Sequence, residues 1–210
     1  MCIASSMLSL DNNPQKVTER RLGLMIVAAT VPLTLVGFMV NYADWSWLKL
    51  VTTLAWVNLM FAALLWLADR FSGHSLTLSD MRWPAALGIG LLQVCALIPG
   101  ASRSGVTMTA ARIFGYDRLT AARFSLLLSV PAIAGAGLLK TIDLMLLGDV
   151  RLGIDAALVA MLSALFAWLA VRLMMVWLTK ADFTIFVLYR LVLSSVLLIA
   201  LQQDLISAVI

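Results

Sequence analysis

A segment of nine residues in the middle of the chain combines glycine, hydroxyl and arginine side chains in a way that suits anion binding. It reads Pro99-Gly100-Ala101-Ser102-Arg103-Ser104-Gly105-Val106-Thr107. Gly100 and Gly105 permit turn conformations that other residues avoid. A helix that begins near Ser104 would direct its free backbone N–H groups at the turn. Arg103 adds a planar charge that can bind phosphate oxygens bidentately, so the segment predicts a phosphate site.

We expect Arg103, Ser102 and Thr107 to carry the chemistry at this site. Ser102 or Thr107 would orient an oxygen or act as the nucleophile, and the sequence leaves this choice open. Gly100, Ser104, Gly105 and Arg190 are the predicted phosphate contacts, although Arg190 could instead be a structural partner of backbone carbonyls. Under the alternative interpretation, Arg103 only snorkels or pairs with a carbonyl, and the serines are small residues for helix packing.

The elements that must position this segment have the composition of a membrane protein. Hydrophobic residues make up 62% of the 210 residues and charged residues 12%, whereas soluble domains have roughly 45–50% and 25%. The apolar runs do not alternate, which excludes barrel strands, and they suit a bilayer core that roughly 20 helical residues cross. We therefore expect an all-α polytopic membrane protein with about five spanning helices, over residues 22–40, 49–68, 120–140, 156–179 and 183–203.

Residues 83–114 are predicted to form a re-entrant hairpin in place of a sixth span. Pro99-Gly100 interrupts the apolar stretch, and the apolar piece 106–111 is too short to cross a bilayer. Broken apolar segments of this kind line binding sites near the membrane midplane, where protein or water covers the irregular backbone. We expect arms over residues 83–98 and 101–114, with the tip at Pro99 to Ser104.

The distribution of basic residues supports the hairpin. If its arms enter and leave on one face, that face collects nine basic residues against three for the other, and a full crossing would give seven against five. Positive-inside bias favours the first arrangement, with the mouth of the hairpin toward the cytoplasm. The formal charge of +4 does not indicate a nucleic-acid partner, because the basic residues lie where apolar runs end. The nine are Lys16, Arg20, Arg21, Arg70, Arg82, Arg112, Arg118, Arg123 and Lys180, and the three are Lys49, Lys140 and Arg151.

The nine-residue segment resembles the Pro-Gly-x-Ser-Arg-Ser-Gly-x-Thr motif of the undecaprenyl-diphosphate phosphatases, also called bacitracin-resistance proteins. The resemblance covers most of the chain from about residue 20 onward. It extends to Gln93-Val94-Cys95-Ala96-Leu97, Gly115, Arg118, Ala121-Ala122, Phe124-Ser125-Leu126-Leu127-Leu128, Pro131 and Tyr189-Arg190.

The resemblance implies a function and a location. The substrate would be a C55 isoprenoid diphosphate, hydrolysed to undecaprenyl phosphate and inorganic phosphate, so that the lipid carrier of cell-wall precursors is recycled. The chain would be a multi-pass protein of the bacterial inner (plasma) membrane, and a homo-oligomer is compatible with the sequence. The alternative function is a non-catalytic, anionic-lipid-binding or transporter-like membrane protein, since transporters also contain broken helices and midplane arginines.

The chain departs from the family in its carboxylates. The family carries a Glu-x-x-x-Glu pair and a Ser-Ser-Thr-Gly-His-like turn before the helix that corresponds to residues 22–40, whereas Glu19 is the only glutamate here. We therefore expect residues 1–21 to be a polar leader, a truncated N-terminus, and residues 22–210 to form one membrane domain. The family implies a divalent cation, magnesium or calcium, but its ligands are not found in this sequence. We expect the chain to bind the diphosphate and to hydrolyse it slowly.

Other polar residues are expected to be structural. His74 is superficially like the lost Gly-His but falls between spans, in a surface loop. Asp69 is interpreted as a helix-end charge and Asp117 as a loop or helix-start residue, while Asp155 is well placed to cap a helix from residue 156. Arg172 lies near enough to a helix end to snorkel.

Overall fold

The computed structural model describes residues 14–42, 50–73, 76–147 and 150–203, and His74 lies outside them. These residues form helices, with η2 and η3 as short 3-10 turns. Five of the helices are long and apolar enough to cross a membrane, which confirms the predicted all-α polytopic class. The elements are α2 (Pro14–Tyr42), α3 (Val51–Phe71), η2 (Leu78–Asp80), α4 (Trp83–Leu92), η3 (Gln93–Leu97), α5 (Arg103–Ile113), α6 (Arg118–Leu147), α7 (Val150–Leu178) and α8 (Thr184–Gln202).

Three helix starts or ends differ from the prediction. Helix α2 begins at Pro14, within the predicted leader, where a proline is tolerated because the first helical N–H has no partner. Helices α6 and α7 extend toward each other, and α7 begins at Val150. The prediction that Asp155 caps a helix from residue 156 is therefore wrong, because Asp155 lies inside α7. Gly153 costs only about 1 kcal/mol in a helix interior, too little to end the helix there.

The segment 83–114 forms a helical hairpin, as predicted, and its two ends meet. The N–H of Leu76 donates to the carbonyl of Gly115 at 3.3 Å, and the N–H of Asp117 donates to the carbonyl of Leu76 at 2.9 Å. The first arm ends in the η3 turn, so α4 is shorter than predicted, and the second arm, α5, begins at Arg103. These hydrogen bonds join the start of the hairpin to its end, which is the arrangement that the predicted re-entrant topology requires.

Thr77 and Asp80 shape the loop that leads into the hairpin. The backbone N–H and the hydroxyl of Thr77 both donate to the Asp80 carboxylate, at 2.9 and 2.7 Å. These two hydrogen bonds hold the pKa of Asp80 below its usual range. The loop therefore has a defined turn before α4 begins at Trp83.

Asp69 joins four helices at the base of the hairpin. Its carboxylate lies 3.0 Å from Arg112 Nε, at the end of α5, and 2.8 Å from Arg118 Nε, at the start of α6. It also accepts from the N–H of Phe183, which precedes α8, at 3.5 Å. Arg112 is fully buried and donates further to the carbonyls of Tyr116 and Asp69. Asp69 is thus a buried structural partner, in a deeper position than the helix-end charge that the sequence indicates.

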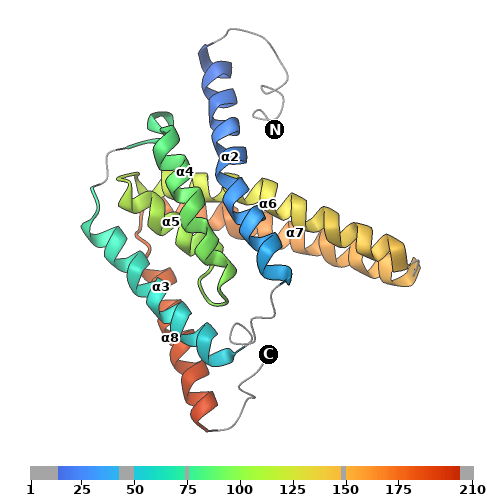
Figure 1. The fold of residues 1–210 in the computed structure, drawn as a ribbon. Helices are drawn as coiled ribbons and strands as arrows, with labels where there is room; N and C mark the ends of the chain where they lie inside the picture. The colour runs from blue at the N-terminus through green and yellow to red at the C-terminus, as the bar shows by residue number, and fades with distance from the viewer. Residues whose placement is uncertain (1–13, 43–49, 74–75, 148–149, 204–210) are drawn as a thin grey trace.

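The hairpin packs between two groups of helices. Its α4 arm lies against α2, with Ala29, Ala86 and Ile89 in one buried cluster, and its α5 arm packs on α3 and α6. Figure 1 shows α3 and α8 running together on one side, while α6 and α7 project from the rest of the molecule as a long pair. The tip of the hairpin is thereby held where α3 and α8 pass beside the start of α5.

Candidate functional site

The turn before α5 has the irregular backbone that the motif predicts. Ser102 is the N-cap residue of α5, and its hydroxyl accepts from the N–H of Gly105 at 3.3 Å. The backbone φ of Ser102 is 59°, a value that strains a residue with a Cβ. Such strain persists only where the surrounding structure holds it, and it is commonest at binding sites. The N-terminus of α5 therefore presents its positive dipole end at the hairpin tip.

Position 100 requires glycine for two reasons, the positive backbone φ and the close approach of helix α3. Its φ is 91°, in the region that favours glycine, and a Cβ at this position would collide with the carbonyl oxygen of Leu54 in α3. The Gly100 carbonyl accepts a hydrogen bond from Arg190 Nη2 at 2.8 Å. Gly100 therefore contributes to the site by letting the tip approach α3 and by binding Arg190.

Arg190 reaches the hairpin tip from α8. Its Nη2 donates to the carbonyls of Gly100 and Ala101, at 2.8 and 3.0 Å, and its Nε donates to Asn58 Oδ1 at 2.6 Å. The remaining nitrogen, Nη1, is buried and has no hydrogen-bond partner among the described residues. A Cβ on Gly105 would lie 2.6 Å from Nη1, so glycine at 105 leaves the space that this nitrogen occupies. Arg190 thus has the carbonyl contacts of the structural role, and its contact with phosphate stays a prediction.

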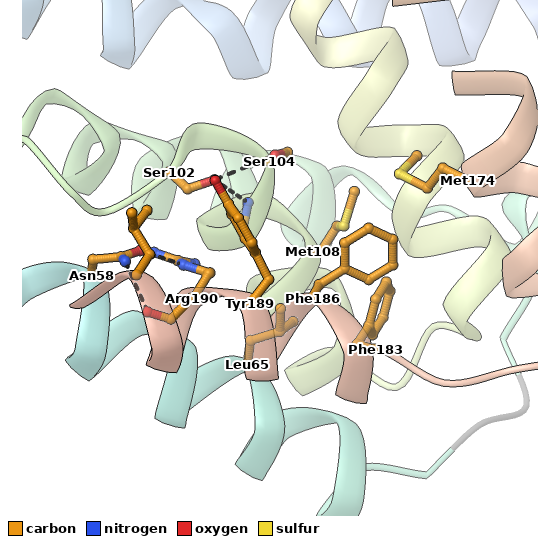
Figure 2. Close-up of a pocket in the computed structure, with 12 residues that line it drawn as sticks. Asn58, Leu65, Ser102, Ser104, Met108, Met174, Phe183, Phe186, Tyr189 and Arg190 are labelled. Atoms are coloured by element: carbon orange, nitrogen blue, oxygen red, sulfur yellow. Dashed lines mark hydrogen bonds between the residues drawn. The ribbon is translucent and has the colours of Figure 1, made fainter. Parts of the chain in front are cut away.

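Arg190 also lines a cavity of about 360 Å³ between α3, α5 and α8. Figure 2 shows that the cavity is polar at one end and apolar at the other. Asn58, Ser102, Ser104 and Arg190 line the polar end, and the Ser102 and Ser104 hydroxyls lie 3.4 Å apart. The apolar lining consists of Leu65, Met108, Met174, Phe183, Phe186 and Leu193. Such a cavity can hold an anionic group at one end and a hydrocarbon chain at the other.

Arg103 points away from this cavity. Its Nη2 donates to the carbonyl of Leu128 in α6, and its side chain lines a separate groove that includes Leu33, Ala132 and Lys140. The structure therefore places Arg103 on the opposite side of α5 from Arg190, with the carbonyl contact that the alternative interpretation of the sequence describes.

Thr107 also lies outside the cavity. It is 1% exposed, and its hydroxyl contacts the Arg103 and Ser104 carbonyls at 3.0 and 3.2 Å and the Ser125 hydroxyl at 2.7 Å. These contacts tie the first turns of α5 to α6. Of the predicted site residues, the structure thus brings together Ser102, Ser104, Gly105, Arg190 and the Gly100 carbonyl, but not the side chains of Arg103 and Thr107.

Asn58 is a site residue that the sequence did not single out. It lies in α3, is 6% exposed and contacts both Arg190 and Ser194. The available signal was a lone amide within an apolar span, because such a residue needs a hydrogen-bonding partner in a membrane. Arg172, by contrast, is exposed on α7 with its guanidinium 5.4 Å from the Trp168 ring centroid.

The side-chain oxygen atoms that line the cavity do not suit a divalent cation. The described lining residues offer amide and hydroxyl oxygens without a carboxylate, whereas magnesium and calcium sites in proteins are built mainly on carboxylates. No group of three potential metal ligands occurs in the described part of the chain. We derive no step through a metal ion from these residues.

Comparison with known proteins gives the same family as the motif. The family described as "Bacitracin resistance protein BacA" matches residues 2–196. A protein of Ruegeria pomeroyi named undecaprenyl-diphosphatase is 40% identical over 179 residues, which are 85% of this chain and 67% of the relative. Proteins of the same name from Chromohalobacter salexigens and Alcanivorax borkumensis are each 41% identical, over 86% of this chain and 68% of the relative. Because the family model matches nearly the whole chain and these relatives are about 40% identical to it, the chain belongs to the bacitracin resistance protein family.

Proposed function

We propose that the chain hydrolyses undecaprenyl diphosphate to undecaprenyl phosphate and inorganic phosphate. Water is consumed, the bond between the bridging oxygen and the terminal phosphorus breaks, and the lipid keeps one phosphate. The membership of the family and the relatives named undecaprenyl-diphosphatase support this reaction. The product would be the lipid carrier that cell-wall synthesis uses again, so we place the chain in the bacterial inner membrane.

The free Nη1 of Arg190 is the observation that carries the proposal. It is a buried cationic donor without a partner among the described residues, and the Arg190 side chain lines the polar end of a cavity whose other lining is apolar. A diphosphate at the N-terminus of α5 would satisfy this donor, and the first isoprene units would contact Met108, Phe183 and Phe186. The charged diphosphate of the lipid would match the polar end of the cavity, and its hydrocarbon chain would match the apolar lining.

Charge neutralisation is the contribution that these residues can make to the reaction. Phosphoryl transfer depends mainly on positioning and on electrostatic stabilisation of the equatorial oxygens. Arg190 and the α5 N-terminus would bind the phosphate oxygens, and binding that strengthens as charge develops lowers the barrier. Arg103 lines a separate groove, so in the role predicted from the motif its side chain would have to turn from the Leu128 carbonyl toward the start of α5.

Ser102 is a better candidate than Thr107 for orienting an oxygen or acting as the nucleophile. The Ser102 hydroxyl lines the cavity and is 3.4 Å from the Ser104 hydroxyl. The Thr107 hydroxyl is buried against Ser125 and helix carbonyls, so it would have to break those contacts to reach a substrate. A serine without an adjacent base is a weak nucleophile, and we therefore favour water orientation.

Binding without hydrolysis is the second candidate function. It is favoured by one observation, the absence of a carboxylate among the described residues that line the cavity. General acid–base assistance is worth roughly 10²–10⁴-fold, so a site without it would bind the diphosphate but turn it over slowly.

Phosphate release from the C55 diphosphate in detergent tests the proposal. We expect release by the wild type and at least a tenfold loss in Arg190→Gln, whereas Arg172→Gln, on the exposed face of α7, should keep the rate. Tight binding of the lipid without any phosphate release would instead favour the second function. Equal rates for Arg190→Gln and Arg172→Gln would contradict the role of the cavity.

A further inference from the structure

We propose that Asn58 and Ser194 are positioning residues that hold the Arg190 guanidinium in one orientation, with Nη1 turned to the substrate. The inference rests on the proposed function, because it assigns Nη1 to a phosphate oxygen. Neither Asn58 nor Ser194 needs to touch the reacting atoms for this role. Both act through Arg190, from two neighbouring spanning helices, α3 and α8.

The hydrogen bonds of Asn58 define which way its amide faces. Its Oδ1 accepts from Arg190 Nε at 2.6 Å, while its Nδ2 donates to Ser194 Oγ at 2.9 Å and to the Arg190 carbonyl at 3.2 Å. If the amide were reversed, its NH₂ group would face the Nε–H of Arg190, and its oxygen would face the Arg190 carbonyl oxygen. Asn58 is 6% exposed and Ser194 is fully buried, so water does not compete for these hydrogen bonds.

The other end of the guanidinium is held by the hairpin tip. Nη2 donates to the Gly100 and Ala101 carbonyls, at 2.8 and 3.0 Å. With Nε on Asn58 and Nη2 on the tip, Nη1 is the nitrogen of the planar group that is left for a ligand of the cavity that Arg190 lines. The bare backbone of Gly105 provides the space beside Nη1. The contacts from three elements therefore define one direction for the remaining donor.

The neutral character of these partners distinguishes Arg190 from the structural arginine of the hairpin base. Arg112 is paired with the Asp69 carboxylate, 3.0 Å away, which compensates its charge. Arg190 donates to the amide oxygen of Asn58, which in turn donates to the Ser194 hydroxyl, and to backbone carbonyls of the hairpin tip. No ion pair to Arg190 occurs among the described residues. An amide orients the guanidinium without neutralising it. The positive charge is thereby kept for an anionic ligand, at the energetic cost that a buried charge carries.

Two substitutions at position 58 separate orientation from charge. Asn58→Ala removes the acceptor for Nε, and Asn58→Asp keeps an acceptor but adds a negative charge beside the guanidinium. Both should weaken binding of the C55 diphosphate by roughly ten- to a hundredfold, the range for a hydrogen bond to a charged group. Asn58→Ala lets the Arg190 guanidinium change its orientation. Asn58→Asp keeps the orientation, but its carboxylate forms an ion pair with the guanidinium.

A double-mutant cycle on the dissociation constant tests whether Asn58 acts through Arg190. If it does, Asn58→Ala combined with Arg190→Lys should bind no more weakly than Arg190→Lys alone. Losses that multiply in the double variant would overturn the proposal, since they would show that Asn58 stabilises the fold or contacts the lipid independently. Thr30→Val is the matched control, because it removes a buried hydrogen bond within α2, from Thr30 Oγ1 to the Ile26 carbonyl, outside the cavity lining.

NMR of the arginine side chains gives a readout that does not depend on activity. In a detergent-solubilised chain labelled with ¹⁵N-arginine, the Nε–H signal of Arg190 is identified as the one lost in Arg190→Lys. Wild type, Ser102→Ala and Asn58→Asp should show slow solvent exchange of this proton, and Asn58→Ala at least tenfold faster exchange. Ser194→Ala should fall between them, because Asn58 keeps its contacts with Arg190. Unchanged exchange in Asn58→Ala would overturn the proposal. A wild type that shows the slow exchange but neither binds nor hydrolyses the C55 diphosphate would overturn the proposed function instead.

Discussion

Two arginines near the hairpin tip differ in what holds them, and this difference decides how each can meet a phosphate. Arg190 is held by neutral groups and has a buried donor without a partner among the described residues, whereas Arg103 donates to the Leu128 carbonyl and faces a groove beside α6. The Arg103 Nε is also buried without a partner among the described residues. Both guanidinium groups therefore retain donors, on opposite sides of the same helix start.

Arg103→Lys is expected to weaken binding of the diphosphate lipid by at least tenfold although the charge is kept. A guanidinium can hold the Leu128 carbonyl and still offer donors to a phosphate, and an ammonium cannot reproduce that planar arrangement. The dissociation constant of the C55 diphosphate measures the effect, with Arg172→Lys as the control on exposed α7. Equal affinity for wild type and Arg103→Lys would exclude Arg103 from the site and leave Arg190 as the phosphate-binding arginine.

At the scale of elements, the hairpin and the Asp69 cluster form one unit. The hydrogen bonds between Leu76, Gly115 and Asp117 join the ends of the hairpin, and Asp69 ties those ends to α3 and α8. The tip carries Ser102 and Gly100, so the rigidity of the base determines how accurately the tip meets Arg190.

The two ends of the hairpin are expected to lie on the same face of the membrane. Cysteines introduced at Ser79 and Phe114, at the two ends of the hairpin, should react with a membrane-impermeant maleimide from the same face, in a background without Cys2 and Cys95. A cysteine at Lys140, toward the far end of α6, should react from the other face. Labelling of positions 79 and 114 from opposite faces would show that the segment crosses the membrane.

The Asp69 ion pairs are expected to stabilise the base of the hairpin. Asp69→Ala leaves the buried Arg112 without its carboxylate, and removing one partner of a buried pair typically costs about 3–5 kcal/mol. We therefore expect a clearly lower unfolding temperature in detergent. Asp155→Ala, which removes an exposed carboxylate from α7, should change it little. Similar unfolding temperatures for the two variants would mean that Asp69 does not hold the four helices together.

At the scale of the whole molecule, the cavity has a binding end and a lipid-compatible end but no carboxylate among its described lining residues. The chain covers about two thirds of the length of the relatives named undecaprenyl-diphosphatase. The described lining residues can bind a phosphate, and acid–base assistance would have to come from a carboxylate outside them.

Supplying a Glu-x-x-x-Glu segment should therefore raise the rate more than the affinity. We expect an N-terminally extended chain that carries this segment to release phosphate about 10²–10⁴-fold faster than the 210-residue chain, in line with the value of acid–base assistance. Both chains should be assayed with and without magnesium or calcium. Full, metal-dependent turnover by the 210-residue chain would contradict this expectation and would direct attention to Asp117 and Asp69 as its carboxylates.

The sequence by itself determined the membrane class, the five spans and the hairpin, because continuous apolar length and a Pro-Gly break depend only on local composition. It also predicted a turn at Gly100, since the glycine preference is local, and a helix start near Ser104, whereas α5 begins at Arg103 with Ser102 as its N-cap. The tertiary structure alone decided which side chains share a cavity. Arg103 turns toward Leu128 in α6, while Ser102, in the turn before the helix, and Ser104 line one cavity with Arg190. Asn58 and Arg190 meet only because α3 packs on α8, a contact between residues far apart in the chain that no local pattern encodes.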